Sequence, residues 1–223
     1  MLAKTGLTSK LSQLIDQTQA LKNTYKPLFF KLIDADQKKA FETLINSEEN
    51  LQVFDYIKAQ VGELIKCLQP TIVFLPPNEL TKAIENKFQG KSTDEYGIWV
   101  YYPWCAKLVH VLDEDEFIVV RTNRNKHKIT LQEQQRLANK KIGIMGLSVG
   151  QSVSLTLAME RGFGELRIAD FDELDLSNIN RIRTGIQNIG VKKTVIVARE
   201  IAEIDPFLNV VCFEEGITAE NLA

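Results

Sequence analysis

One stretch of the chain, "KIGIMGLSVGQSVSLTLAMERGFGELRIADFD" at residues 141–172, constrains the fold more than any other. An apolar run at residues 142–145 stops at Gly146, and a helix is expected over residues 150–161. The segment "ELRIAD" is expected to be a second strand, which ends in Asp170. Apolar runs without polar alternation are typical of parallel strands that are covered on both faces. The order strand, turn, helix, strand therefore predicts an α/β chain with a Rossmann-like βαβ unit, in which a phosphate can bind free backbone N–H groups at the helix N-terminus.

The glycine turn of this unit departs from the dinucleotide fingerprint G-x-G-x-x-G. Ser148 and Gln151 stand where the fingerprint has its second and third glycines. In the fingerprint these glycines let the backbone approach a pyrophosphate and let the helix pack closely on the strand. The turn alone therefore leaves open a site for NAD, a site for another nucleotide, and a Rossmann unit that binds no phosphate.

A long polar run follows the second strand and narrows the choice. A dinucleotide oxidoreductase places a single carboxylate there for the ribose hydroxyls. Here the chain reads "DFDELDLSNINRIRTGIQNIGVKK", in which Leu174, Leu176 and Ile179 separate many short hydrogen-bonding side chains around Arg181. A solvated loop explains this composition poorly. The candidate site residues in the run are Asp170, Asp172, Ser177, Asn178, Asn180, Arg181 and Lys193.

This run resembles the ThiF/MoeB-type adenylyltransferases, whose THIF-type NAD/FAD-binding fold is shared with the ubiquitin-activating enzymes. "DFDELDLSNINR" matches the family pattern D-x-D-x-(V/L)-x-x-S-N-x-x-R, "GVKK" matches G-x-x-K, and "IAEIDP" matches the helix end I-x-x-x-x-P. The resemblance covers residues 140–223 well. It extends weakly to "RTNRN" at residues 121–125, which is similar to the family's R-Y-x-R-Q segment. Residues 1–94 match no well-studied member and suggest a bacterial branch with an N-terminal helical extension.

The resemblance implies an enzyme that uses ATP to activate a carboxylate, usually the C-terminal glycine of a ubiquitin-like or sulfur-carrier protein. The carboxylate attacks the α-phosphate and gives an acyl adenylate and pyrophosphate. An arginine and a lysine suit this chemistry because they neutralise charge on the phosphates, and no covalent nucleophile is needed.

The resemblance also implies a role for each matching residue. Asp170 would hold the ribose, and residues 177–181 would line the phosphate side. Arg181 would be the main cation and Lys193 the second, while Arg124 would reach the partner's site in a homodimer. The further nucleotide-binding candidates are Gly146, Ser148, Val149, Gly150, Asp172, Ser177, Asn178 and Asn180.

The implied cofactors are ATP and Mg²⁺. The family's magnesium-binding aspartate, its groove for the substrate tail and any thioester cysteine would lie beyond Ala223, so we expect the chain to be the first part of a longer enzyme and to be inactive alone. Two other functions stay open: an inactive nucleotide-binding or dimerisation module, and an NAD- or FAD-linked oxidoreductase.

The rest of the chain predicts two further regions. Residues 1–94 are expected to be mostly helical, because apolar residues recur at helical spacing, with a short strand at "TIVF". Residues 95–139 are expected to be a β-rich connector, with strands on both sides of the turn-like "DEDE" and a strand-face His110. A helix should then start at the capping box formed by Thr130 and Glu133. Residues 140–223 form the nucleotide-binding domain.

Composition excludes several classes of protein. The formal charge of −2, from 27 basic and 29 acidic residues, gives no reason to expect a nucleic-acid or membrane partner. No window reaches the roughly 18 apolar residues needed to span a bilayer, and the N-terminus lacks the apolar core of a signal peptide. Three widely spaced cysteines, Cys67, Cys105 and Cys212, suit a reducing compartment and no metal site. We therefore expect a soluble, cytoplasmic protein.

Overall fold

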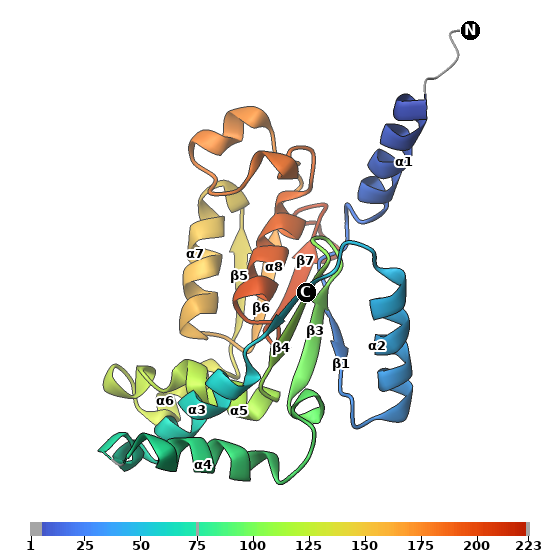
Figure 1. Cartoon of the computed structure of the whole chain (residues 1–223). Coiled ribbons are helices and arrows are strands. Elements are labelled where there is room, and N and C mark those ends of the chain that lie inside the picture. Colours follow the sequence, from blue (N-terminus) through green and yellow to red (C-terminus); the bar gives the residue numbers. More distant parts are fainter. Residues whose placement is uncertain (1–5, 75, 222–223) are drawn as a thin grey trace, which may run out of the picture. The chain divides into compact units, whose positions relative to one another are not determined.

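The computed structural model describes residues 6–74 and 76–221 (Figure 1). Contacts divide the chain into two compact units. The first, here called the three-stranded unit, combines the residues up to Lys26 with those from Ala138 onwards. The second, the four-stranded unit, runs from Pro27 to Leu137. The expected boundary after residue 94 falls inside the four-stranded unit.

The three-stranded unit contains the parallel sheet expected from the sequence. Its strands are β5 (Lys141–Met145), β6 (Glu165–Ala169) and β7 (Asn209–Phe213), all parallel and in the order β5-β6-β7. Helix α7 (Leu147–Glu160) connects β5 to β6, and helix α8 (Lys193–Ile204) precedes β7. The two helices contact each other, as can be followed in Figure 1. The strand–turn–helix–strand prediction is therefore confirmed, with α7 beginning three residues earlier than expected.

One face of this sheet carries the core of the unit. Leu166 and Ile168 of β6 pack with Leu147 of α7 and Ile201 of α8, and all four are fully buried. The opposite face is partly open, and Met145 on it is 72% exposed. The expectation that β5 is covered on both faces was therefore wrong. Within the described part of the chain, α7 and α8 pack on one face, and β6 is the single strand paired with β5.

The N-terminal residues join this unit through the end of α1 (Gly6–Ala20) and the segment after it. The guanidinium of Arg199 on α8 donates hydrogen bonds to the carbonyls of Leu21 (2.6 Å), Lys22 (3.1 Å) and Thr24 (2.8 Å). These carbonyls lie in the turn after α1, so the arginine connects that turn to α8. Burial raises the pKa of the Cys212 thiol to about 12, which agrees with a packing role rather than a nucleophilic one.

The four-stranded unit has a mixed sheet in the order β1-β3-β4-β2. Antiparallel pairs join β1 (Leu28–Phe30) to β3 (Ile98–Tyr102) and β3 to β4 (Lys107–Val111), while β2 (Gln52–Asp55) runs parallel to β4. Residues 1–94 are thus mostly helical as predicted, and they also supply two short strands. The helices of this unit are α2 (Ala35–Ser47), α3 (Ile57–Leu68), α4 (Pro77–Phe88), α5 (Glu114–Thr122) and α6 (Leu131–Leu137).

Two local expectations about this unit were wrong, and a third is confirmed. Residues 114–122, which begin within "DEDE", form helix α5 rather than a turn and a strand. The acidic first turn suits a helix N-terminus, and Phe117 and Val120 pack on the hydrophobic core of this unit. "TIVF" forms a 3₁₀-helix, Pro70–Phe74, rather than a strand. The capping box before α6 is present: the Thr130 N–H donates to Glu133 (2.8 Å), and the Glu133 N–H donates to the Thr130 hydroxyl (3.2 Å).

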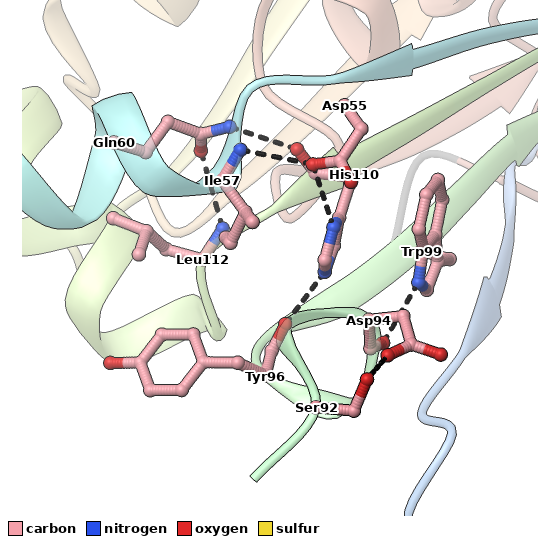
Figure 2. A network of polar contacts seen from close by, with 9 residues as sticks. All are labelled: Asp55, Ile57, Gln60, Ser92, Asp94, Tyr96, Trp99, His110 and Leu112. Carbon is pink, nitrogen blue, oxygen red and sulfur yellow. Dashed lines mark hydrogen bonds and ion pairs between the residues drawn. The ribbon is translucent and has the colours of Figure 1, made fainter. Parts of the chain in front are cut away.

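His110 is a strand-face residue, as expected, and it is completely buried in a polar network (Figure 2). Its Nε2 donates to the Tyr96 carbonyl at 2.6 Å, and its Nδ1 lies 3.0 Å from Asp55 Oδ1. Trp99 stacks on the ring with the centroids 4.1 Å apart. The ring therefore ties β2 and β4 to the loop before β3. No helix among the residues described is both long and apolar enough to cross a membrane.

Candidate functional site

A cavity of about 340 Å³ lies at the carboxyl ends of β5 and β6 in the three-stranded unit. Ligands of open parallel sheets bind at this edge, because the loops that leave the strands there diverge and leave a crevice. Both polar and apolar residues line it. They are Met145, Gly146, Ser148, Ala169, Asp170, Phe171, Asp172, Gly216 and Ile217.

Asp170 fixes the geometry of the turn that opens α7. Its Oδ2 accepts the Leu147 N–H at 2.6 Å, and its Oδ1 accepts the Asp172 N–H at 2.9 Å. The carboxylate is 8% exposed and lies at the positive end of the α7 dipole. Gly146 has φ of +80°, a conformation that an L side chain rarely adopts. The turn is therefore held by one buried carboxylate and one glycine.

Lys193 lies beside the same carboxylate. Its Nζ is 2.6 Å from Asp172 Oδ2 and 4.0 Å from Asp170 Oδ1, and its side chain is 4% exposed. The chain folds this way because residues 172–174 pair antiparallel with residues 190–193. Leu174 exchanges backbone hydrogen bonds with Gly190 and Val191, each at 2.9 Å. The D-x-D segment and the G-x-x-K segment are separated along the chain, and this pairing makes them adjacent in the fold.

The "SNINR" segment forms a 3₁₀-helix, Leu176–Asn180, followed by Arg181. Asn178 is buried and forms a reciprocal capping box with Asp175, so its side chain supports the fold of the segment itself. Asn180 and Arg181 are exposed, and Arg181 Nη1 donates to Asn180 Oδ1 at 3.0 Å. Ser177 is exposed as well. None of these four residues lines the cavity described above.

Two further candidates, Val149 and Gly150, have different positions in the turn. Val149 is 74% exposed and does not line the cavity. At Gly150 an added Cβ would lie only 2.6 Å from Ile144 Cγ2, so this glycine allows the close packing of α7 on β5. Arg124 belongs to the four-stranded unit, where it is exposed at the start of a short 3₁₀-helix, Asn125–His127.

The geometry so far is that of a glycine turn at a helix N-terminus beside a paired carboxylate and lysine. Residues 121–223 match the ThiF family. This segment is a ThiF-family domain. The match includes the whole cavity and the "SNINR" segment, as the resemblance in the sequence implied.

Curated relatives of the ThiF-family domain include an uncharacterized protein of Mycobacterium tuberculosis (strain CDC 1551 / Oshkosh), 44% identical over 124 residues, which are 56% of this chain and 17% of that protein. A probable molybdopterin-synthase adenylyltransferase of Porphyra purpurea is 32% identical over 105 residues, 45% of this chain and 28% of that protein. Ubiquitin-like modifier-activating enzyme 5 of Arabidopsis thaliana is 29% identical over 84 residues, covering 38% of this chain and 20% of that protein. The chain thus spans less than a third of the length of these relatives.

Solved structures similar to the chain include the E. coli tRNA N6-threonylcarbamoyladenosine dehydratase TcdA, which has also been solved in complex with ATP. It is 26% identical, with a TM-score of 0.42 over 45% of this chain and 42% of that one. E. coli MccB with ATP is 18% identical, with a TM-score of 0.40 over 70% of this chain and 46% of that one.

Several residues of the ThiF-family domain were missed by the sequence reasoning. Met145, Phe171, Gly216 and Ile217 line the cavity, and an added Cβ on Gly216 would lie 3.3 Å from the Phe171 ring. A single apolar residue between two aspartates shows neither helical nor strand periodicity. The sequence pattern therefore gave no reason to place Phe171 in the lining of the cavity. Lys192, next to the predicted cation, donates to the carbonyls of Phe171 (2.9 Å) and Glu214 (3.4 Å), which only the fold brings together.

Gln151 was also missed, because the sequence marked it only as the position of a lost glycine. It is 3% exposed, and its side chain bonds to the backbone of Arg183 and to Glu200 on α8. Burial raises the pKa of the Glu200 carboxyl, although hydrogen bonds from Gln151 and Thr184 act in the opposite direction. Among the residues that the structure describes, no three His, Cys, Asp or Glu side chains converge to hold a metal ion.

Proposed function

We propose that the protein uses ATP to adenylate a carboxylate, with the ThiF-family domain as its nucleotide-binding part. The observation that carries the proposal is the arrangement of Asp170, Asp172 and Lys193 at the N-terminus of α7, beside a cavity at the carboxyl edge of the sheet. A carboxylate for the ribose, a helix N-terminus for phosphate and a buried cation are the parts that adenylation needs.

The residues present fit ATP. The first-turn N–H groups of a helix have no acceptor inside the helix, so those of α7 after Leu147, whose own N–H donates to Asp170, are suited to a phosphate. The Ser148 side chain lies at the cavity, and a volume of about 340 Å³ falls within the usual range for ligand pockets. Bound ATP would supply the electrophilic α-phosphate. We include Mg²⁺ as a companion of the ATP phosphates, since Mg²⁺ is commonly held by phosphates and one or two carboxylates rather than by an all-protein cage.

Each residue of this chain has a separate task in the proposal. The Asp170 carboxylate, oriented by the N–H groups of Leu147 and Asp172, accepts hydrogen bonds from the ribose hydroxyls. The ion pair with Asp172 holds the Lys193 ammonium in place, and in the proposal that ammonium lies near the phosphates. Arg181 is exposed and free to turn from Asn180 toward the phosphates as negative charge builds there. Gly146, Ser148, Val149 and Gly150 form the turn that the nucleotide approaches, and Ser177, Asn178 and Asn180 support the arginine.

The carboxylate belongs, in this proposal, to the C-terminus of a ubiquitin-like or sulfur-carrier protein. Two relatives, a probable molybdopterin-synthase adenylyltransferase and a ubiquitin-like modifier-activating enzyme, support this class of substrate. We further propose that the enzyme is a cytoplasmic homodimer.

A second function, an inactive nucleotide-binding or dimerisation module, is favoured by one observation. Lys193 is already paired with Asp172 at 2.6 Å, and Arg181 lies outside the lining of the cavity. When the charged side chains of a site pair with each other, they can stabilise the fold without taking part in a reaction.

Calorimetric titration with ATP, adenosine and NAD, together with pyrophosphate exchange, separates these functions. We expect ATP to bind more tightly than NAD, and radiolabelled pyrophosphate to enter ATP when the intact protein is given a carrier protein with a C-terminal glycine. Tighter binding of NAD than of ATP would contradict the adenylation site. Binding of ATP without exchange across a panel of carrier proteins would favour the inactive module.

Mixing two inactive variants tests the proposed role of Arg124 in a dimer. If Arg124 serves the partner's site, Arg124→Ala and Arg181→Ala proteins that exchange subunits form heterodimers with one intact composite site. Activity should recover to about a quarter of wild type, because half of the dimers are mixed and each has one working site of two. Pyrophosphate exchange is the readout, and native mass spectrometry confirms subunit exchange. A mixture that stays inactive despite exchange would contradict the role in trans.

A further inference from the structure

We propose that Gln151 is a positioning residue that holds the Arg181-bearing loop, residues 181–184, against helix α7 for contact with nucleotide phosphates. The inference rests on the proposed function of the site and adds a residue that the glycine pattern had marked only as a departure. Its basis is a set of hydrogen bonds between segments that lie far apart in the sequence.

The Gln151 side chain binds both backbone groups of one residue in the loop. Its Oε1 accepts the Arg183 N–H at 3.1 Å, and its Nε2 donates to the Arg183 carbonyl at 3.1 Å. The same Nε2 donates to Glu200 Oε2 on α8 at 2.8 Å. Both the oxygen and the nitrogen of the amide are therefore hydrogen-bonded. A buried amide that lost these partners would be left unsatisfied. The loop segment at Arg183 is thus bonded to α7 in the way that a neighbouring strand would be.

Gly150 explains why a long side chain is possible at position 151. In the dinucleotide fingerprint the third glycine allows close packing of helix on strand. Here Gly150 makes that approach, since a Cβ there would come within 2.6 Å of Ile144. The packing role has moved one residue earlier along the helix. Position 151 therefore lies off the strand contact, and its side chain extends to the loop and to α8 instead.

Arg181 lies between two anchors as a result. On one side its backbone N–H donates to the Asn178 carbonyl at 3.1 Å, at the end of the "SNINR" helix. On the other side the bonds to Gln151 fix Arg183, and Ile182 between them is 4% exposed. The backbone of Arg181 is fixed while its side chain is exposed. A fixed backbone lowers the conformational entropy that the arginine loses when it engages a phosphate.

The first test needs no nucleotide. Hydrogen–deuterium exchange of the intact protein is compared for wild type, Gln151→Ala and the control Ser152→Ala, whose side chain is exposed on the same helix. We expect Gln151→Ala to speed exchange across residues 181–185 by about tenfold or more, while peptides from β6 stay unchanged. Unchanged exchange in the loop would overturn the inference. An equal rise in β6 would also overturn it, because the effect would then be global.

A charge exchange provides the matched rescue. Gln151→Glu places a second carboxylate beside Glu200, so the loop should loosen at least as much as in Gln151→Ala. Adding Glu200→Gln restores a donor opposite position 151 but not the donor to the Arg183 carbonyl, so loop exchange should become slower than in Gln151→Glu without reaching the wild-type rate. A folded double variant whose loop stays as loose as that of the single variant would overturn the pairing.

Titration with ATP and adenosine then separates positioning from simple packing. We expect Gln151→Ala to weaken ATP binding about tenfold and to leave adenosine binding unchanged, because the loop serves the phosphates. Equal weakening for both ligands would overturn the phosphate role. If wild type bound neither ligand, the proposed function would fail, whereas the exchange experiments would still show whether Gln151 holds the loop.

Discussion

Replacing Arg181 with alanine is expected to slow pyrophosphate exchange by about a hundredfold or more, while the melting temperature stays close to that of wild type. The side chain is exposed and bonds to its neighbour Asn180, so little of the fold depends on it. In the proposed reaction the guanidinium meets negative charge that builds on the phosphates during attack. The measurement is the exchange rate with a carrier protein, accompanied by thermal unfolding.

Arg183→Ala is the matched control for Arg181. This arginine is also exposed and lies in the same loop, but its backbone rather than its side chain holds the loop to Gln151. The control should exchange pyrophosphate at nearly the wild-type rate. An Arg181→Ala protein within about threefold of wild type would remove Arg181 from the proposed mechanism, since the loss of one such contact commonly costs far more.

Replacing Lys193 with methionine is expected to destabilise the protein strongly and to abolish ATP binding. The ammonium is 4% exposed beside two carboxylates, and its removal leaves Asp170 buried without a compensating charge. Breaking a buried ion pair in this way costs about 3–5 kcal/mol. For a chain of this length we expect the melting temperature to fall by about 6–20 °C. Thermal unfolding and titration with ATP at 4 °C measure the two effects separately.

Lys192→Met is the control for Lys193, with the same change at the adjacent position. Among the described residues Lys192 donates to two backbone carbonyls rather than to a carboxylate, so its loss removes hydrogen bonds without leaving a buried charge unpaired. We expect a smaller fall in melting temperature and retained ATP binding. If Lys192→Met were the more damaging of the two changes, the assignment of the second cation to Lys193 would be wrong.

Much of the ThiF-family domain was visible in the sequence. The apolar runs, the glycine at the end of β5 and the helix that follows predicted the βαβ unit, and its parallel strands are confirmed. The motif residues Asp170, Asp172 and Lys193 lie together, as the resemblance implied, although their roles remain a prediction. Motif matching works here because the residues of each pattern are close in sequence, and their spacing fixes how they lie relative to one another.

Other features were outside the reach of local pattern. "DEDEFIVVRT" has the composition of a turn and a strand, yet residues 114–122 are helical because Phe117 and Val120 pack on the core of their own unit. The N-terminal region was read as helical, and its strands β1 and β2 are so short that they give no clear period. In both cases a partner element far along the chain selects the conformation.

The sequence by itself determined the βαβ order, the capping box before α6 and the family of the C-terminal segment. Each of these depends on residues within a few positions of one another. Only the tertiary structure decided which face of β5 is covered, that Gly150 makes the close contact with Ile144, and that Gln151 is bonded to residues 32 and 49 positions away. The physical reason is that a hydrogen bond or a steric contact between distant segments depends on how helices and strands pack, and spacing along the chain does not record that packing.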